Sequence, residues 1–356
     1  MGLLKKKAPA VSELARHYDL GEPLGVGGTA TVFLSSLRSA DRVPGLAPGA
    51  SVAIKTMHKK VVPVAEIEKE VAVMRKVSGH PNIMMLYDVF LKDPRDAHLV
   101  MEVLSGGTLF DRVINQGYYS EQHAASACRM MCAGLDCLHT RGFVHRDLKP
   151  ENLMYASEAE DAVLKLIDFG TCVAMGGGEP KTSCGTPGYV APEILRDEGH
   201  DDPAVDMWSA GVVVYILLCG FPPFYQEEQE ELFAAIRQAQ FDYPDDSAWA
   251  EISADAKRFV QQLLTLDTDG RLSARQVLAH EYVAAAESGK YAVAHGTTAH
   301  REIACRKLRK VAFGIIAGVR MARGAGVGVE EAQEEDEDEE QRVGPTPAEQ
   351  QLTGAR

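Results

Sequence analysis

The chain has 356 residues, a hydrophobic content of 46% and a formal net charge of −14 at pH 7. This length is enough for one large two-lobed domain with extensions, or for two ordinary domains. The acidic balance argues against nucleic acid as the main partner, because binding to phosphate groups needs clustered Lys and Arg. Nine of the 51 acidic residues lie in the run EEAQEEDEDEE at 330–340, which we expect to be solvated low-complexity sequence.

The cysteines and the apolar runs predict an intracellular protein. The seven cysteines are odd in number and include no C-x-x-C pair, so they fit neither a disulfide framework nor a zinc cluster. The N-terminus lacks the apolar core of a signal peptide, and the longest apolar run, at 210–220, is too short to span a bilayer. We therefore expect a buried helix at 210–220, no membrane contact, and a cytoplasmic location with the nucleus as a further option.

In chain order, strand-like segments come first and helical segments follow. Alternating apolar residues predict strands at 20–34 and 51–57, separated by the Pro- and Gly-rich insert RSADRVPGLAPGA at 38–50. Helical spacing of apolar residues predicts a helix at 63–78, and a buried strand follows at 98–104. The helical pattern then dominates, apart from a strand-like LKLIDFG at 164–170. This order predicts an α+β chain with two unequal lobes.

A glycine-rich loop precedes a strand that ends in a lysine. LGVGGTATV at 24–32 could be no more than a turn, but its glycines would also let backbone N–H groups approach phosphate oxygens. In VAIK at 52–55, the lysine can reach the α- and β-phosphates of a nucleotide. A buried Lys55 needs an acidic partner, because an unpaired buried charge is costly. The expected helix supplies Glu70 at the start of its inward-facing apolar face, with Glu66 and Glu68 as alternatives.

The stretch VHRDLKPENL at 144–153 concentrates groups that suit phosphoryl transfer. Asp147 can accept a proton from an attacking hydroxyl, and Lys149 can neutralise charge on the transferring phosphoryl group. Asn152 can ligate a metal through its amide oxygen, and Asp168 in IDFG supplies a carboxylate for Mg²⁺. Alone, HRDLKPEN could be a salt-bridged turn before a strand. Its order with VAIK, DFG and APE favours a catalytic site instead.

These motifs give the chain its resemblance to a known family. Residues 18–284 resemble the eukaryotic serine/threonine protein kinases, and among them the calcium/calmodulin-dependent protein kinase (CAMK) group. The likeness is carried by PNIMMLYDVF, VMEVLSGGTLFDRV, VHRDLKPENLM, IDFGTC, CGTPGYVAPEIL and VDMWSAGVVVYILLCGFPPF. The resemblance implies the bilobal protein-kinase fold, with a small β-rich N-lobe that contains one key helix and a larger, mainly helical C-lobe. The implied boundaries are 1–17 for a basic N-terminal tail, 18–101 for the N-lobe, 102–284 for the C-lobe, 285–324 for an autoregulatory segment and 325–356 for an acidic tail.

The resemblance also implies roles for individual residues. Lys55 and Glu70 should form the ion pair of the active state, and Asp147 should be the catalytic base, assisted by Lys149. ATP should bind together with Mg²⁺, whose ligands should be Asn152 and Asp168. The ATP site should comprise Leu24, Gly25, Val26, Gly27, Gly28, Val32, Ala53, Lys55, Met101, Glu102, Leu104, Glu151, Asn152, Leu153, Ile167 and Asp168.

Further positions follow from the same resemblance. Met101 should be the gatekeeper, and the backbone of Glu102 and Leu104 should read the adenine edge. GTPGYVAPE places Thr186 at the substrate-facing position of the family. Three residues should be structural, namely the buried pair Glu193 and Arg271, and Asp206 as a brace for the catalytic loop.

Two positions depart from the family pattern. The third glycine of the loop is replaced by Ala30, which should stiffen the loop without blocking phosphate. Thr108 stands where this group usually has a Glu that binds the ribose and a basic residue upstream of the acceptor. Glu151 is retained and could still meet an Arg three residues before the acceptor. A weakened preference for R-x-x-S/T in protein substrates is therefore expected.

Two features point to regulation. In the family, Arg146 meets a phosphorylated activation loop, and Thr182 lies at the expected phosphorylation position, with Ser183 as the alternative. The segment REIACRKLRKVAFGIIAGVRMARG at 301–324 holds seven Lys or Arg and resembles the Ca²⁺-calmodulin-binding regulatory segment of this group. Permanent packing on the large lobe and contact with lipid are the alternatives for this segment.

The leading interpretation is a serine/threonine protein kinase that transfers the ATP γ-phosphate to protein substrates under calcium/calmodulin control. One alternative is a catalytically weak pseudokinase or scaffold, and another is an active kinase of the same group without calmodulin control. The joint presence of Lys55, Asp147, Asn152 and Asp168 favours catalysis over the scaffold.

Overall fold

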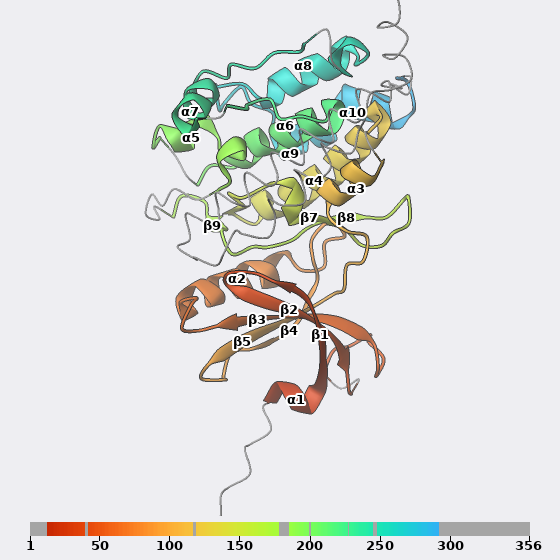
Figure 1. The fold of residues 1–356 in the computed structure, drawn as a ribbon, viewed down its shortest axis with the longest axis vertical. Helices are drawn as coiled ribbons and strands as arrows, with labels where there is room; N and C mark the ends of the chain where they lie inside the picture. The colour runs from red at the N-terminus through yellow and green to blue at the C-terminus, as the bar shows by residue number, and fades with distance from the viewer. Residues whose placement is uncertain are drawn as a thin grey trace, which may run out of the picture. The chain divides into compact units, whose positions relative to one another are not determined.

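The computed structural model describes residues 13–39, 42–116, 119–177, 185–198, 201–226, 228–244 and 248–291. All of them belong to the first of two compact units into which the chain divides, Met1–Lys310. The second unit, Val311–Arg356, lies outside the described residues. Within the first unit, a five-stranded sheet with one long helix is followed by a mainly helical region (Figure 1).

The sheet is antiparallel and has the strand order β1-β2-β3-β5-β4. Its strands are β1 (Tyr18–Val26), β2 (Ala30–Leu37), β3 (Ser51–His58), β4 (Leu86–Phe90) and β5 (Asp96–Met101). The helix α2 (Val64–Val77) follows β3 in the sequence and corresponds to the helix expected at 63–78. Its apolar residues recur at helical spacing, so Ile67, Val71 and Met74 are buried on the same face as Glu70.

One face of the sheet is covered by α1 (Glu13–His17) and by part of the insert 38–50. The insert is held by Arg42, which donates from Nε and Nη2 to the two oxygens of Asp88 at 2.5 and 3.3 Å and lies over the Phe90 ring. The basic tail expected at 1–17 therefore includes a helix that packs on the sheet. The core cluster on this face comprises Leu14, Tyr18, Leu37, Val43, Val52, Ile54, Phe90 and Val100.

The helical region is built around α6 (Ala204–Cys219), in which every residue from Val205 to Cys219 is buried. This confirms the buried helix expected at 210–220. Among the described residues, no helix combines the length and the apolar character that a membrane crossing requires. The other helices are α3 (Leu109–Gln116), α4 (Glu121–Thr140), α5 (Pro192–Leu195), α7 (Gln229–Arg237), α8 (Ala254–Leu263), α9 (Ala274–Leu278) and α10 (Glu281–Glu287).

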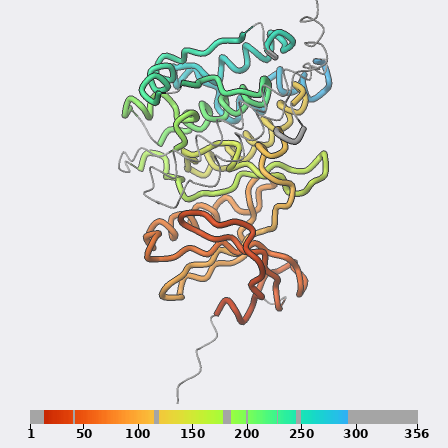
Figure 2. Tube along the Cα trace, viewed as in Figure 1, coloured from red at the N-terminus to blue at the C-terminus, as the bar shows by residue number. Residues whose placement is uncertain are grey.

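Short strands and 3₁₀ turns make up much of the chain between these helices. The strands are β6 (Phe143–Val144), β7 (Leu153–Tyr155), β8 (Leu164–Leu166) and β9 (Val173–Ala174), and they form the pairs β6–β9 and β7–β8. The 3₁₀ turns are η1 (Pro150–Asn152), η2 (Pro187–Tyr189) and η3 (Ala248–Ala250). In Figure 2, the red-to-orange chain forms the sheet region and the yellow-to-blue chain forms the helical region, so each region is continuous in the sequence.

Hydrogen bonds join the two regions directly behind the site. The N–H of Met84 donates to the carbonyl of Leu166 at 3.0 Å, and the N–H of Leu166 donates to the carbonyl of Asn82 at 2.9 Å. The side-chain amide of Asn82 donates to the carbonyl of Leu164, also at 2.9 Å. The segment that links α2 to β4 is thereby attached to β8, which leads into Asp168.

The helical region continues beyond the boundary expected after residue 284. That boundary lies within α10, which is fastened to α4 because Arg129 donates from Nε to a carboxylate oxygen of Glu287 at 2.5 Å. The hydroxyl of Tyr291 donates to Asp255 at 2.7 Å. The packed structure therefore extends at least to Tyr291, the last described residue.

Candidate active site

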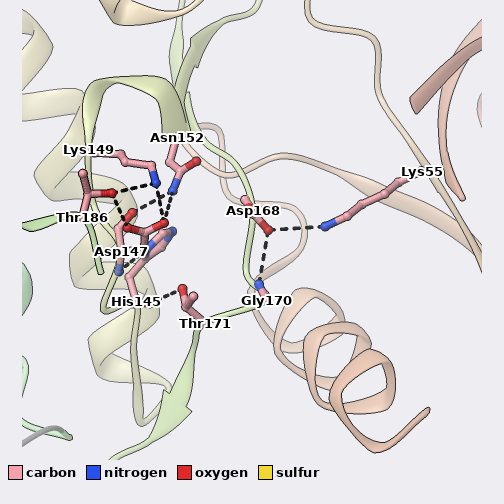
Figure 3. Close-up of polar contacts among 9 residues, drawn as sticks. All are labelled: Lys55, His145, Asp147, Lys149, Asn152, Asp168, Gly170, Thr171 and Thr186. Carbon is pink, nitrogen blue, oxygen red and sulfur yellow. Dashed lines mark hydrogen bonds and ion pairs between the residues drawn. The ribbon is translucent and has the colours of Figure 1, made fainter. Parts of the chain in front are cut away.

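β3 and α2 bring a lysine and a glutamate together on the face of the sheet opposite the core cluster. Alternation along β3 places Ile54 in that cluster and directs Lys55 to the other side. Lys55 Nζ lies 2.7 Å from Glu70 Oε1 and 3.3 Å from Asp168 Oδ1. The first contact is the ion pair expected from the sequence. The second joins the sheet to the loop after β8 (Figure 3).

Electrostatics keep both partners of the second contact charged. Burial by itself would lower the pKa of Lys55, but the carboxylates of Asp168 and Glu70 outweigh burial and raise it above the usual value. The ammonium of Lys55 in turn lowers the pKa of Asp168 against the effect of burial. The stability that this lowered pKa contributes is fully present above the unfolded-state value of about 3.9 and is lost as the pH falls through the folded-state value. Both groups are therefore ionised at neutral pH.

The turn that carries the HRD motif is held by a buried carboxylate from α6. Arg146 has a φ of 68°, in the left-handed region that few non-glycine residues adopt. Asp206 accepts from the backbone N–H groups of His145 and Arg146 at 2.8 Å each, and it lies 2.8 Å from His139 Nε2. Burial would raise the pKa of Asp206, but these partners, His139 above all, lower it. Asp206 thus occupies the bracing position expected from the resemblance.

Three polar side chains converge on Asp147 (Figure 3). Lys149 Nζ donates to Asp147 Oδ2 at 2.8 Å and to Thr186 Oγ1 at 2.9 Å, while the Thr186 hydroxyl donates to Asp147 Oδ1 at 3.2 Å. Asn152 Nδ2 donates to the Asp147 carbonyl at 2.7 Å and to Oδ2 at 3.2 Å. Its amide oxygen points away from Asp147, on the side of Asp168 (Figure 3). The carboxylate of Asp147 is therefore fixed as a potential proton acceptor.

The loop between β1 and β2 leaves space beside its glycines. The N–H of Gly27 donates to the carbonyl of Ala30 at 2.8 Å and closes the turn. A Cβ added at Gly25 or Gly28 would meet no atom within 4 Å. The backbone of this loop is consequently open to a ligand, as its glycines predict.

The segment 101–104 connects β5 to the helical region and has free hydrogen-bonding groups. Within the part of the chain that the structure describes, the carbonyl of Glu102 accepts no hydrogen bond and the N–H of Leu104 donates none. Of the apolar residues expected at the ATP site, Ala53, Met101 and Leu153 are buried, Val32 and Ile167 are half-buried, and Leu24 and Val26 are exposed.

Metal binding at this site would depend on a ligand that brings its own oxygens. Among the described residues, no group of three or more His, Cys, Asp and Glu side chains could hold a metal ion. Mg²⁺, however, is usually held by one or two protein oxygens together with phosphate oxygens and water. Asn152 and Asp168 fit that donor set.

The profile of the protein kinase domain family matches residues 18–283. This match spans more than half of the chain and contains the candidate site residues described above. The chain belongs to the protein kinase family.

Curated relatives narrow this assignment. The calcium/calmodulin-dependent protein kinase type 1B of Homo sapiens is 41% identical over 285 residues, which cover 80% of this kinase and 79% of the relative. The type 1 kinase of Macrobrachium nipponense is 40% identical over 279 residues, covering 78% and 77%. The type IV kinase of Homo sapiens is 40% identical over 315 residues, covering 86% and 63%. The protein is a serine/threonine protein kinase of the CAMK group.

The kinase has a buried salt bridge between α5 and the segment that follows α8. Arg271 donates to the two carboxylate oxygens of Glu193 at 2.6 and 3.1 Å, and also to the carbonyls of Ala204 at 2.7 Å and Thr265 at 3.0 Å. These bonds connect α5, the start of α6 and the loop after α8. Glu193 and Arg271 therefore form the buried pair that the resemblance implied.

Glu151 and Thr108 differ in their hydrogen bonding. Glu151 Oε2 is buried and has no hydrogen-bond partner within the described ranges, and burial raises the pKa of this carboxyl. The hydroxyl of Thr108 donates to Asp111 Oδ2 at 2.6 Å and accepts from the Asp111 N–H at 3.0 Å. Thr108 thus caps the start of α3, which gives a physical reason for the departure at this position.

The regulatory residues are only partly described. Arg146 donates from Nε to the carbonyl of Thr171 at 3.0 Å, and the Thr171 hydroxyl donates to the carbonyl of His145 at 2.9 Å. Thr182 and Ser183 lie outside the described residues, as does the segment 301–324. Thr171 was not identified from the sequence, because its contact depends on how the segment after β8 folds back on the catalytic turn.

Proposed function

We propose that this kinase transfers the γ-phosphate of ATP, bound with Mg²⁺, to Ser or Thr hydroxyls of protein substrates. The observation that carries the proposal is the cluster in which Lys149 and Thr186 fix the carboxylate of Asp147. Its oxygens can accept the proton of an incoming hydroxyl, while Lys149 can neutralise charge on the transferring group. The loss of one of these groups would favour a pseudokinase over an active enzyme. Asp147, Lys149 and Thr186 are all in place here.

The residues around this cluster suit a magnesium nucleotide. Lys55 carries a positive charge that can pair with phosphates, and the open backbone between Gly25 and Gly28 can approach them. Asn152 and Asp168 would hold the metal, which supplies charge neutralisation for the phosphoryl group. The free carbonyl of Glu102 complements a donor on the base, as adenine offers.

Phosphorylation of a peptide tests the proposal. With Mg-ATP, the wild-type kinase should label a basic peptide that contains R-x-x-S, and it should not label the same peptide with Tyr in place of Ser. Asp168→Ala should remove the labelling, because a metal ligand is lost, whereas Asp19→Ala on the surface should not change it. Equal labelling by wild type and Asp168→Ala would contradict the proposed site.

We further infer a preference for a basic residue upstream of the acceptor. The buried, unpartnered oxygen of Glu151 supports this, because a guanidinium would supply the missing donor. The engagement of Thr108 in the cap of α3 leaves Glu151 without the second carboxylate usual in this group. The preference should therefore be weaker than two carboxylates would produce.

Calcium/calmodulin control is the regulatory part of the proposal. Two observations support it: the basic, apolar sequence of 301–324, and the names of the relatives, which describe calcium/calmodulin-dependent enzymes. In this proposal the segment restrains the kinase until Ca²⁺-calmodulin binds it. An active kinase without calmodulin control remains the alternative.

Truncation and binding distinguish these alternatives. Removing the residues after 295 should raise basal activity, and Ca²⁺-calmodulin should activate the full chain but not the truncated one. A peptide of residues 298–324 should bind calmodulin only with calcium, and Leu308→Asp with Ile315→Asp should abolish binding. Unchanged basal activity together with no calcium-dependent binding would favour permanent packing of the segment.

A further inference from the structure

The residue after the gatekeeper carries a partly buried ion pair that the phosphotransfer chemistry does not use. Lys165 Nζ lies 2.9 Å from Glu102 Oε1, and the two side chains are only 13% and 18% exposed. The same carboxylate oxygen accepts from the N–H of Met85 at 2.6 Å. The N–H of Glu102 donates to the carbonyl of Met85 at 3.1 Å. Glu102 is therefore attached twice to Met85 and once to Lys165.

These attachments come from different parts of the fold. Lys165 lies in the middle of β8, between Leu164 and Leu166, which bond to the carbonyl and side chain of Asn82 and to Met84. Met85 immediately precedes β4 of the sheet. The carboxylate of Glu102 thus bridges the helical region and the sheet at the point where the chain passes from one to the other.

The backbone of Glu102 offers a ligand the acceptor that adenine needs. The edge of adenine presents an amino group as donor beside a ring nitrogen as acceptor. The free carbonyl of Glu102 matches the amino group, and the free N–H of Leu104 matches the ring nitrogen. A residue held through its own N–H and its carboxylate has little freedom to rotate, so the direction of its carbonyl is set before a ligand arrives.

We propose that Lys165 is a positioning residue for adenine recognition, which acts through the carboxylate of Glu102 on the direction of the Glu102 carbonyl. The inference rests on the proposed ATP site and adds to it a residue that touches no nucleotide atom. Loss of the Lys165 ammonium leaves the partly buried carboxylate of Glu102 with one donor instead of two, which weakens the constraint on the peptide group. Loss of Lys165 therefore weakens the hydrogen bond to the amino group of the base and leaves the contacts with the phosphates unchanged.

A comparison of two nucleotides isolates this effect. Steady-state kinetics are measured on the full chain with Mg-ATP and with the magnesium complex of purine riboside triphosphate, which lacks the amino group. Lys165→Met should raise KM for ATP about fivefold, the size of one ordinary hydrogen bond. KM for the analogue should change less than about twofold, because it has no amino group to lose. Lys165→Arg should restore KM for ATP, since it keeps a positive donor.

Three further variants complete the test. Glu102→Gln should show the same selective rise in KM, and its combination with Lys165→Met should add no further increase, because both changes remove one interaction. Lys290→Met, at an exposed lysine paired with Asp255, serves as the matched control and should behave like wild type. In all of these variants kcat should stay within about twofold, because the groups lie away from the transferring phosphate.

The outcomes separate this inference from the proposed function. A wild-type protein that labels no peptide contradicts the proposed function itself. An active wild type with unchanged KM in Lys165→Met overturns the positioning role. An equal rise in KM for both nucleotides also overturns it, because that result describes a general loosening of the site and not a misdirected carbonyl. Wild-type KM values that do not distinguish the two nucleotides would show that the carbonyl does not read the amino group.

Discussion

At the scale of single residues, three carboxylates differ in how far their oxygens are satisfied. Glu70 is paired with Lys55, and Asp206 lies within hydrogen-bonding distance of three nitrogen atoms around the catalytic turn. Glu151 keeps one oxygen without a partner. An unpaired buried acceptor costs on the order of 1–3 kcal/mol, so its retention is most easily explained by a donor that arrives with a ligand.

The raised pKa of Glu151 predicts a pH-dependent affinity for basic peptides. As the pH falls, Glu151 takes up a proton at a higher pH than the usual glutamate value of about 4.3, and the neutral form no longer attracts a guanidinium. KM for an R-x-x-S peptide should therefore rise on mild acidification. In Glu151→Gln it should be high at every pH. A peptide with Leu in place of Arg is the control, and an identical pH profile in wild type and Glu151→Gln would contradict this role.

Candidate site residues that lie close together in the sequence could be identified from the sequence alone. Asp147, Lys149 and Asn152 lie within six positions of one another, and the structure places them in one hydrogen-bonded group. The pairing of Lys165 with Glu102 spans 63 positions. No spacing rule connects a lysine in a short strand with the residue after the gatekeeper, so this contact needed the fold.

At the scale of elements, the insert 38–50 shows how a loop becomes part of a core. Its Pro and Gly content predicted an irregular backbone, yet Val43 is buried in the cluster over the sheet. Arg42 secures it through both oxygens of Asp88. The hydroxyl of Tyr18 donates to the same carboxylate at 3.3 Å. The insert therefore covers the face of the sheet that lies away from Lys55.

This arrangement predicts that two arginines of the insert contribute differently to the free energy of unfolding. Arg42→Met should lower the free energy of unfolding by about 1.5–3 kcal/mol, because a partly buried, charged hydrogen-bond pair is broken. Arg38→Met removes a pair with Asp19 in which both side chains are largely exposed, and it should cost at most about 1 kcal/mol. Urea denaturation of the two variants gives both values. Equal losses would show that the insert is not anchored through Asp88.

The elements with strong periodicity were those predicted from the sequence. The strand β3 and the helix α2 lie close to their expected ranges because alternation and helical spacing report burial on one face. The helix α1 has only five residues and was not expected. Its place depends on Leu14 reaching the cluster formed by β1 to β5, which is a tertiary contact that local pattern does not encode.

At the scale of the whole molecule, the described residues form a kinase domain in which the candidate site residues lie together. The contact of Lys55 with Asp168 and the bonds between Asn82 and β8 connect the sheet to the helical region around one site. The resemblance predicted this fold because its motifs fix the identity of the domain. The expected phosphorylation of Thr182 and the regulatory segment at 301–324 stay predictions, since they fall on residues outside those described.

The central claim is that Asp147 acts as the base in phosphoryl transfer to Ser or Thr. The most direct test is the rate of peptide phosphorylation by Asp147→Asn with saturating Mg-ATP, with Asp161→Asn at an exposed carboxylate as the control. We expect kcat to fall at least about 100-fold, because the proton acceptor is lost, and nucleotide affinity to change by less than about threefold. A wild-type value of kcat in Asp147→Asn would contradict it.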